Sequence, residues 1–171
     1  LMQLSLADYI TINISSPNTE NLRDFHDESK LESLLEAINK LKKEFGGFMP
    51  IFVKVSPDIK DSSVEKISEI IIAQKVQGAI LTNTTSVNRS SLKSSNKDQA
   101  GGLSGKPIRD LSNKMINKFY KKLKGKAFII GVGGVDSGKS AFEKIAAGAN
   151  AVQLYTGMIY KGPGIVKEIK K

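Results

Sequence analysis

A chain of 171 residues is long enough to bury the core of one domain, and a hydrophobic content of 40% is ordinary for a globular protein. The absence of cysteine excludes disulfides and thiolate metal ligands, and a single histidine leaves little for a metal cluster. The formal charge of +9 is spread over lysines that alternate with acidic residues, as in 30–44, so we interpret it as a solvated surface. We therefore expect neither a bound metal nor a nucleic-acid partner. No apolar run approaches the length that spans a bilayer.

The opening stretch, residues 8–19, has the pattern of a buried strand that runs into a polar loop. Residues 9–12 are β-branched or aromatic, and Pro17 biases Ser16 toward an extended conformation. Polar groups at the carboxyl end of a strand lie where ligands bind in α/β folds. Taken alone, the stretch is equally typical of an ordinary turn. Its polar side chains are those of Asn13, Ser15, Ser16, Asn18 and Thr19.

Two helices and two strands alternate after this opening strand. Each predicted helix begins with a capping-box spacing, Ser29 with Glu32 and Ser62 with Glu65, ahead of apolar residues at helical spacing. Short apolar runs of this length between turns are typical of buried strands. The further expected features are strands at 51–55 and 78–82, a helix end at Gly46-Gly47, a turn at 58–61 and the polar run Asn83-Thr84-Thr85.

The rest of the chain contains a long polar segment, three helices and two strands. Residues 86–106 show no periodicity, and so long a segment in a compact domain is usually functional or disordered. Pro107 suits the first turn of a helix whose apolar stripe runs over 108–119. The other expected elements are a strand at 128–132 that meets Gly133-Gly134, a helix at 140–147 capped by Asp136 or Ser137, a strand at 151–154 that ends at 155–157, and a helix that begins near Pro163.

Five strand–helix units with continuous apolar strands predict a parallel sheet covered by helices. One candidate is a complete doubly wound domain of flavodoxin type. The other is the latter part of a (β/α)8 TIM barrel, which needs about 250 residues in full. The strand ends favour the barrel, because each carries a polar group or glycine that could face a common centre, whereas a doubly wound sheet concentrates its ligand contacts at one switch point. We therefore interpret residues 1–171 as a single-domain fragment that supplies roughly the last five units of a barrel.

Two features indicate an anionic ligand. Lys54 lies inside an apolar strand, where an unpaired ammonium is costly, so it should meet an anion or an electron-rich ligand. The alternative is an ion pair with a buried carboxylate, although the apolar run offers no neighbouring acid. Residues 131–137, G-V-G-G-V-D-S, would let backbone N–H groups approach a phosphate at a helix start, although a glycine-rich turn is a weak signal alone.

Six motifs, in order along nearly the whole chain, carry a resemblance to a known family. They are N-I-S-S-P-N-T at 13–19, V-K-V at 53–55, T-N-T-T at 82–85, G-G-L-S-G-K-P at 101–107, G-V-G-G-V-D-S at 131–137 and Y-T-G at 155–157. With them the chain resembles the class 2, quinone-linked, dihydroorotate dehydrogenases. The resemblance implies an FMN-binding (β/α)8 barrel whose first part is absent here, including the N-terminal helices that meet quinone and membrane.

The resemblance also implies roles for individual residues. Ser16 matches the catalytic base that takes a proton from C5 of dihydroorotate, and Thr19 matches the hydroxyl that relays this proton. Lys54 matches the lysine near the flavin pyrimidine edge, and Thr82 matches a contact to the flavin ring. The residues that match substrate ligands are Asn13, Asn18, Asn83 and Thr84. Asn13 is also a candidate contact to the flavin. The residues that match contacts to the FMN phosphate or ribityl chain are Gly105, Gly134, Tyr155 and Thr156.

We therefore expect FMN-dependent oxidation of dihydroorotate to orotate in pyrimidine biosynthesis, with a quinone as the electron acceptor. The expected partners are dihydroorotate and orotate, the quinone, and the remaining N-terminal part of the same barrel. That absent part would give peripheral attachment to a membrane, at the cytoplasmic face if the source is bacterial. The fragment alone should be inactive. The alternative function is a non-catalytic flavodoxin-like module that binds a flavin or a phosphate.

Overall fold

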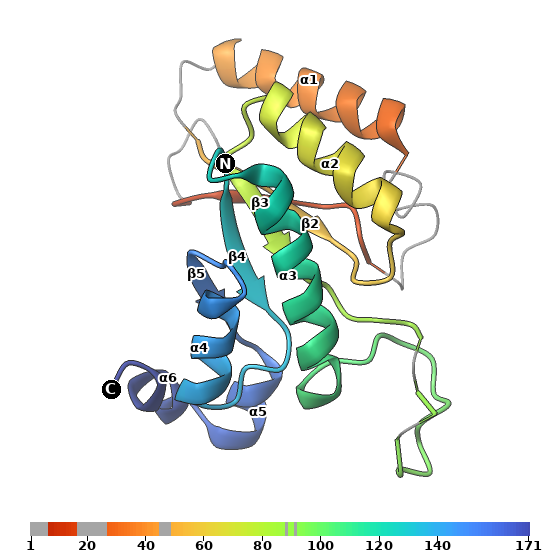
Figure 1. Ribbon diagram of the computed structural model, residues 1–171, viewed down its shortest axis with the longest axis vertical. Helices are drawn as coiled ribbons and strands as arrows, with labels where there is room; N and C mark the ends of the chain where they lie inside the picture. The colour runs from red at the N-terminus through yellow and green to blue at the C-terminus, as the bar shows by residue number, and fades with distance from the viewer. Residues whose placement is uncertain (1–6, 17–26, 45–48, 88, 91) are drawn as a thin grey trace.

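The computed structural model describes residues 7–16, 27–44, 49–87, 89–90 and 92–171, and they form alternating strands and helices (Figure 1). The strands are β1 (Ile10–Asn13), β2 (Ile51–Val55), β3 (Gly78–Leu81), β4 (Phe128–Val132) and β5 (Ala151–Gln153). The helices are α1 (Glu28–Glu44), α2 (Asp61–Ala73), α3 (Arg109–Leu123), α4 (Gly138–Ala146), α5 (Thr156–Lys161) and α6 (Gly164–Ile169), and the short 3₁₀ helix η2 (Lys106–Ile108) leads into α3.

The five strands form one parallel sheet in the order β1-β2-β3-β4-β5, so every strand pairs with its neighbour in the sequence. A flavodoxin-type sheet has the order 2-1-3-4-5 and reverses direction at a switch point. Sequential order without reversal is the arrangement of a (β/α)8 barrel. The predicted parallel sheet and the barrel topology are therefore confirmed, and the doubly wound alternative is wrong.

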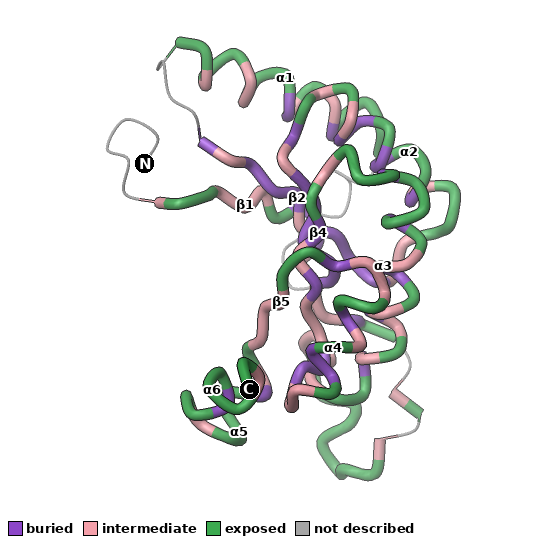
Figure 2. The backbone as a smooth tube through the Cα atoms, turned by 60° about the vertical axis from the view of Figure 1, so that its left-hand side comes forward, coloured by how far each residue is buried: buried purple, intermediate pink, exposed green. Residues whose placement is uncertain are grey.

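The hydrophobic core lies between one face of the sheet and helices α1, α2 and α3, of which α2 and α3 run along one side of the strands in Figure 2. Val53, Leu81 and Ile129 from the strands pack there with Ile67 of α2 and Phe119 of α3, all nearly inaccessible to solvent. These residues alternate along each strand with residues that face the other way. The opposite face would form the interior of a closed barrel.

This opposite face carries the polar strand residues. Asn13, Lys54 and Ile80 are aligned in register across β1, β2 and β3, so their side chains share that face. The helices therefore bury the apolar half of each strand and leave Asn13 and Lys54 adjacent, toward the carboxyl ends of the strands. In parallel barrels, the carboxyl ends of the strands are where active sites lie.

Several helix starts differ from the expected ones. Asp27, not a Ser29–Glu32 capping box, caps α1: its carboxylate accepts hydrogen bonds from the N–H groups of Ser29 and Lys30. Helix α2 begins at Asp61 with no side-chain cap, so the second predicted capping box is also wrong. Ser137 caps α4, as one of the two alternatives predicted. The predicted helix end at Gly46-Gly47 falls outside the described residues.

The C-terminal part contains one helix more than the sequence indicates. Residues 155–157, where the expected fifth strand ends, lead directly into α5, which begins at Thr156 and ends at Lys161, before the expected helix near Pro163. Six residues are too few for a hydrophobic period to be recognised. None of the helices in the described ranges is long and apolar enough to cross a membrane.

Candidate functional site

A cavity of about 160 Å³ lies beyond the carboxyl ends of β2, β3, β4 and β5. Its walls come from the strand ends and from the loops that follow them, which is the position of ligand sites in parallel barrels. The cavity brings together most of the predicted site residues although they are far apart in the sequence. Those that line it are Lys54, Thr82, Asn83, Thr84, Gly105, Gly134, Tyr155 and Thr156.

Asn13, Ser15 and Asn83 form a hydrogen-bonded group that joins the end of β1 to the end of β3. The Asn13 side-chain oxygen accepts from the Ser15 hydroxyl at 3.1 Å and from the Asn83 amide at 3.3 Å. The Asn83 amide also donates to the Ser15 hydroxyl at 3.0 Å. Ser15 is fully buried. From the sequence alone it is only one member of the polar run after the first strand. The group fixes two carboxamides beside the cavity.

Lys54 is half-buried on β2 and lies in register between Asn13 and Ile80. Burial lowers the pKa of its ammonium, because a charged group loses hydration there. Across the described ranges, Lys54 makes neither a hydrogen bond nor an ion pair, so the alternative of a buried carboxylate partner is not found there. An ammonium aimed into a cavity without a protein partner is suited to an anion or an electron-rich ring edge.

Thr82 lies at the end of β3 and lines the same cavity. Its backbone N–H donates to the carbonyl of Val132 at 2.9 Å, which ties β3 to β4. Its hydroxyl is buried and has no hydrogen-bond partner among the described residues. Leaving a buried hydroxyl unpaired is unfavourable by about 1–3 kcal/mol, so a ligand with a polar atom at this point would satisfy it.

The turn at Gly133 and Gly134 forms another wall of the cavity. Both residues have positive φ angles, +116° and +76°, which glycine adopts without strain. A Cβ atom on Gly134 would lie 2.6 Å from Cβ of Arg109, so no side chain fits there. The Gly134 carbonyl accepts from Nε of Arg109 at 2.8 Å, and that guanidinium pairs with Asp136 at 2.5 Å.

The carboxylate of Asp136 is held charged beside this turn. Burial acts to raise its pKa, but hydrogen bonds from Ser140 and Ser137 and the charge of Arg109 outweigh burial and leave the pKa below its usual value. Across the cavity, the Thr156 hydroxyl donates to the Ser104 hydroxyl at 2.9 Å, next to Gly105, whose φ is +73°. Gly105 and Gly134 both line the cavity.

The long segment 86–106 is anchored at both ends. Asp58, in the turn after β2, accepts hydrogen bonds from the Thr85 hydroxyl and from the Ser86 N–H at 3.0 Å. Thr85 pairs with Leu103 as an antiparallel bridge. Within the segment, the Arg89 guanidinium donates to the Gln99 carbonyl at 2.5 Å and to that of Gly101. These bonds give the polar segment a defined course.

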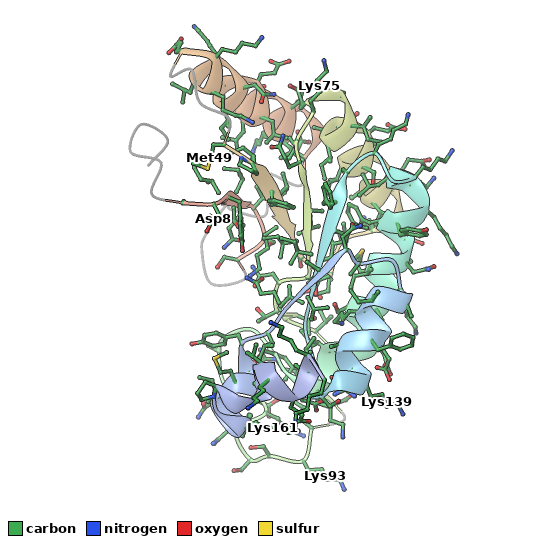
Figure 3. All side chains as sticks on the ribbon, turned by 90° about the vertical axis from the view of Figure 1, so that its left-hand side faces the viewer. Asp8, Met49, Lys75, Lys93, Lys139 and Lys161 are labelled. Atoms are coloured by element: carbon green, nitrogen blue, oxygen red, sulfur yellow. The ribbon has the colours of Figure 1, made fainter. Side chains whose placement is uncertain are left out.

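This segment, with the glycine turn and α5, encloses a second hollow of about 670 Å³. The two cavities share wall residues, among them Gly105, Gly134 and Thr156. Lys93 and Lys161 also line the larger one, and both lie at the same end of the molecule in Figure 3. The segment thus covers the part of the predicted site that contains Gly105, Gly134 and Thr156.

Comparison with known proteins agrees with this arrangement. The family model described as dihydroorotate dehydrogenase matches residues 1–171. The chain belongs to the dihydroorotate dehydrogenase family. Among curated relatives, a protein of Idiomarina loihiensis named dihydroorotate dehydrogenase (quinone) is 46% identical over 167 residues, with 95% of this chain and 50% of the relative covered. One of Psychrobacter arcticus with the same name is 47% identical over 165 residues, covering 94% and 48%.

Solved structures of dihydroorotate dehydrogenases are also similar. A structure of the Eimeria tenella enzyme in complex with ferulenol has a TM-score of 0.94 at 34% identity, covering 99% of this chain and 50% of that one. The ligand-free enzyme of the same organism gives 0.92 at 36% identity, covering 96% and 50%. This chain therefore spans about half the length of the dihydroorotate dehydrogenases that it matches, and the family is flavin-dependent in general.

Three predicted site residues, Ser16, Asn18 and Thr19, follow β1 in the sequence. Ser16 is half-buried at the end of the described stretch after β1, next to buried Ser15. Asn18 and Thr19 lie outside the described residues. Ser104 and Asp58 contribute to the site or to its support but are not among the predicted site residues. Ser104 lies within the conspicuous glycine-rich motif at 101–107, and Asp58 is the acid in the turn predicted after β2, so the sequence contained a signal for both.

Proposed function

We propose that these residues form half of the active site of an enzyme that oxidises dihydroorotate to orotate with FMN as its cofactor and a quinone as the final acceptor. The observation that carries this proposal is the single cavity lined by Lys54, Thr82 and the glycine turn. Within the described residues it combines an ammonium without a protein partner, a buried hydroxyl without a hydrogen-bond partner and the backbone of a glycine turn. Family membership supports the same assignment.

These residues fit a flavin mononucleotide. The orphaned Thr82 hydroxyl supplies a hydrogen-bonding group for the polar edge of the ring, and the Lys54 ammonium supplies positive charge near it. Gly105, Gly134 and Thr156 would hold the phosphate end, and Tyr155 would contribute chiefly through its backbone, because the residue is 77% exposed. When bound, FMN supplies the acceptor for the hydride that leaves C6 of dihydroorotate.

The carboxamide group beside the cavity would bind the substrate. Asn13 and Asn83 are suited to the carboxylate and ring amides of dihydroorotate, because a carboxamide both donates and accepts hydrogen bonds. Ser15 holds the two side chains in place through bonds of 3.1 and 3.0 Å. Thr84 lines the same cavity, and Asn18 follows in the same loop as Asn13. Precise orientation of this kind raises the rate by fixing the reacting carbon against its acceptor.

Ser16 would act as the general base that removes the proton from C5. A serine hydroxyl has a high pKa, so its proton must be passed on, and we assign this relay to Thr19. Lys54 would favour the oxidation electrostatically, since a nearby cation stabilises the negative charge that electron transfer brings to the ring. The quinone and the attachment to a membrane remain predictions that involve residues outside this chain.

The decisive experiment is anaerobic mixing of dihydroorotate with a complete enzyme that contains these residues. We expect a flavin spectrum with FMN released on denaturation, bleaching of that spectrum by dihydroorotate, and its recovery on adding a quinone. A protein that binds flavin but is not bleached would instead be the non-catalytic flavin module. No observation favours that second function, because the sequential sheet order differs from the flavodoxin order.

A further inference from the structure

Lys144, on α4, is the one lysine of the described residues that is fully inaccessible to solvent. Its ammonium donates to the Asn113 carboxamide oxygen at 2.7 Å, to the Ser112 hydroxyl at 3.0 Å and to the Arg109 carbonyl at 3.5 Å. All three partners are neutral, and none of the ion pairs of the described residues includes Lys144. Burying an ammonium without a carboxylate is costly, so the position of this charge requires an explanation.

A chain of hydrogen bonds leads from Lys144 to the glycine turn. Lysine has only donors, so Ser112 accepts from Lys144 and uses its own hydrogen to donate to the Val132 carbonyl at 2.7 Å. A trans peptide is planar and its C=O and N–H point in opposite directions. The same carbonyl also accepts from the Thr82 N–H at 2.9 Å, so Ser112 acts together with the sheet. The two bonds hold the Val132 carbonyl away from the N–H of Gly133, which points to the other side, and Gly133 lines the cavity.

Arg109 does the same for the next part of the turn. It holds the Gly134 carbonyl at 2.8 Å, which turns the N–H of Val135 away from α3. No hydrogen bond joins the N–H groups of Gly134 or Val135 to another group in the described ranges. Gly134 and Val135 line both cavities. The carbonyl side of the turn is thus bonded to two cationic residues, one directly and one through Ser112, while N–H groups remain available on the ligand side.

Gly131 makes this arrangement sterically possible. A Cβ atom there would lie 3.2 Å from Cβ of Lys144 and 3.0 Å from Cβ of Ala149. Real Cβ contacts are rarely so close, so glycine at 131 lets α4 pack against β4 closely enough for Lys144 to reach Ser112. In the G-V-G-G run, Gly131 therefore makes room for the buried Lys144, while Gly133 and Gly134 form the turn.

We propose that Lys144 is a positioning residue for a phosphate monoester: through Ser112 it orients the turn 132–135, and from behind the turn it supplies positive charge to a bound dianion. The proposal rests on the proposed function, in which this turn holds the phosphate of the flavin. Its chemical consequence is selectivity for FMN over the unphosphorylated flavin. A lysine that only supports the fold would affect both flavins equally.

The test is a titration of the complete apoenzyme with FMN and with riboflavin, followed by quenching of flavin fluorescence. In Lys144→Met we expect the affinity for FMN to fall about tenfold, the loss expected when a charge-assisted interaction is removed, while the riboflavin affinity changes less than about twofold. The matched control is Lys139→Met, an exposed lysine of the same helix (Figure 3), which should change neither affinity. Equal losses for both flavins, or no loss for FMN, would overturn the proposal.

A pH series on the unmutated enzyme keeps the test decisive if Lys144→Met does not fold. Burial, and to a smaller extent the charge of Arg109, lower the pKa of Lys144 to about 8. The carboxylates of Glu143 on the same helix and Asp110 on α3 act in the opposite direction and raise this pKa. Lys144 therefore loses its charge as the pH rises through 8, whereas a phosphate monoester is already a dianion above about pH 7. The ratio of FMN affinity to riboflavin affinity should fall at least about threefold from pH 7 to pH 9.

A ratio that stays constant over this range would overturn the proposal. The proposed function can fail separately: an unmutated enzyme that binds neither flavin would refute both statements. A second outcome would refute only the role of Lys144. In it, the unmutated enzyme binds both flavins, the ratio of FMN affinity to riboflavin affinity does not change with pH, and Lys144→Met lowers both affinities equally or neither.

Discussion

At the scale of the residue, Lys54 belongs to a strand whose side chains point alternately toward the hydrophobic core and toward the site. Its neighbours Val53 and Val55 are buried against the helices, while Lys54 shares the other face with Asn13. We expect Lys54→Met in the complete enzyme to lower the two-electron reduction potential of the flavin by about 30 mV or more, equivalent to about 1.4 kcal/mol, because reduced flavin loses a stabilising cation. A redox titration with measured flavin occupancy checks this.

The control is Lys122→Met, which removes a surface lysine paired with Glu65 and should leave both potential and occupancy unchanged. An unchanged potential at full occupancy in Lys54→Met would remove Lys54 from the flavin site. The apoprotein should tolerate this substitution well, since burial disfavours the charged ammonium and no protein partner in the described ranges loses a bond.

Ser16 gives a second prediction at this scale. We expect Ser16→Ala to retain FMN and orotate binding but to slow flavin reduction by dihydroorotate at least ~10²-fold, the typical effect of losing a general base. Ser16→Cys should keep partial activity with a shifted pH optimum, because a thiol ionises more readily. Stopped-flow reduction separates the two effects. The comparison variant is Ser15→Ala, which should weaken orotate binding instead, because it breaks the bonds to Asn13 and Asn83. Reduction of Ser16→Ala at the parental rate would exclude Ser16 as the base.

At the scale of the element, the segment 86–106 depends on the turn after β2. Asp58 accepts hydrogen bonds from Thr85 and Ser86, and charged acceptors of this kind contribute about 1.5–3 kcal/mol each. We therefore expect Asp58→Ala to open the segment and to speed tryptic cleavage at Lys93 and Lys97 by about tenfold or more. Limited proteolysis followed by mass spectrometry measures this. Glu36→Ala, an exposed acid on α1 that is remote in sequence from both cleavage sites, is the control and should leave the cleavage rate unchanged.

The elements also show which parts of the structure the sequence contains. Strands β2 and β4 are short apolar runs with clear boundaries, and they lie where expected. The choice between the two α/β architectures rested on polar strand ends, and the sheet order bears it out. The cap of α1 was misplaced because Asp27, like Ser29, is a good capping residue, and local spacing does not choose between them. The burial of Lys144 depends on the missing Cβ of Gly131 on a neighbouring strand, which no local pattern in α4 reveals.

At the scale of the whole molecule, the sheet is open within the described residues. β1 pairs only with β2, and β5 pairs only with β4, so each has one strand edge without a partner there. Large apolar side chains are also exposed, including Phe128 on β4 at 60% and Ile159 on α5 at 68%. Parallel sheets are normally buried on both faces and barrels have no edges, so the described part of the chain exposes surface that a closed barrel would cover.

A polypeptide of these 171 residues expressed alone should therefore self-associate through its strand edges and should not oxidise dihydroorotate with a quinone. Size-exclusion chromatography with light scattering, over a range of protein concentrations, measures the association. Charged side chains discourage edge pairing, so Thr11→Lys with Ala151→Lys, which adds one lysine to each edge strand, should shift the protein toward the monomer. Ser33→Lys with Ala37→Lys, on the exposed face of α1, adds the same two charges without touching an edge and should leave the association unchanged. A monodisperse, active monomer would mean that the sheet edges are satisfied in a way that the described residues do not reveal. Equal effects of the edge variant and the helix variant would mean that net charge, not strand pairing, governs the association.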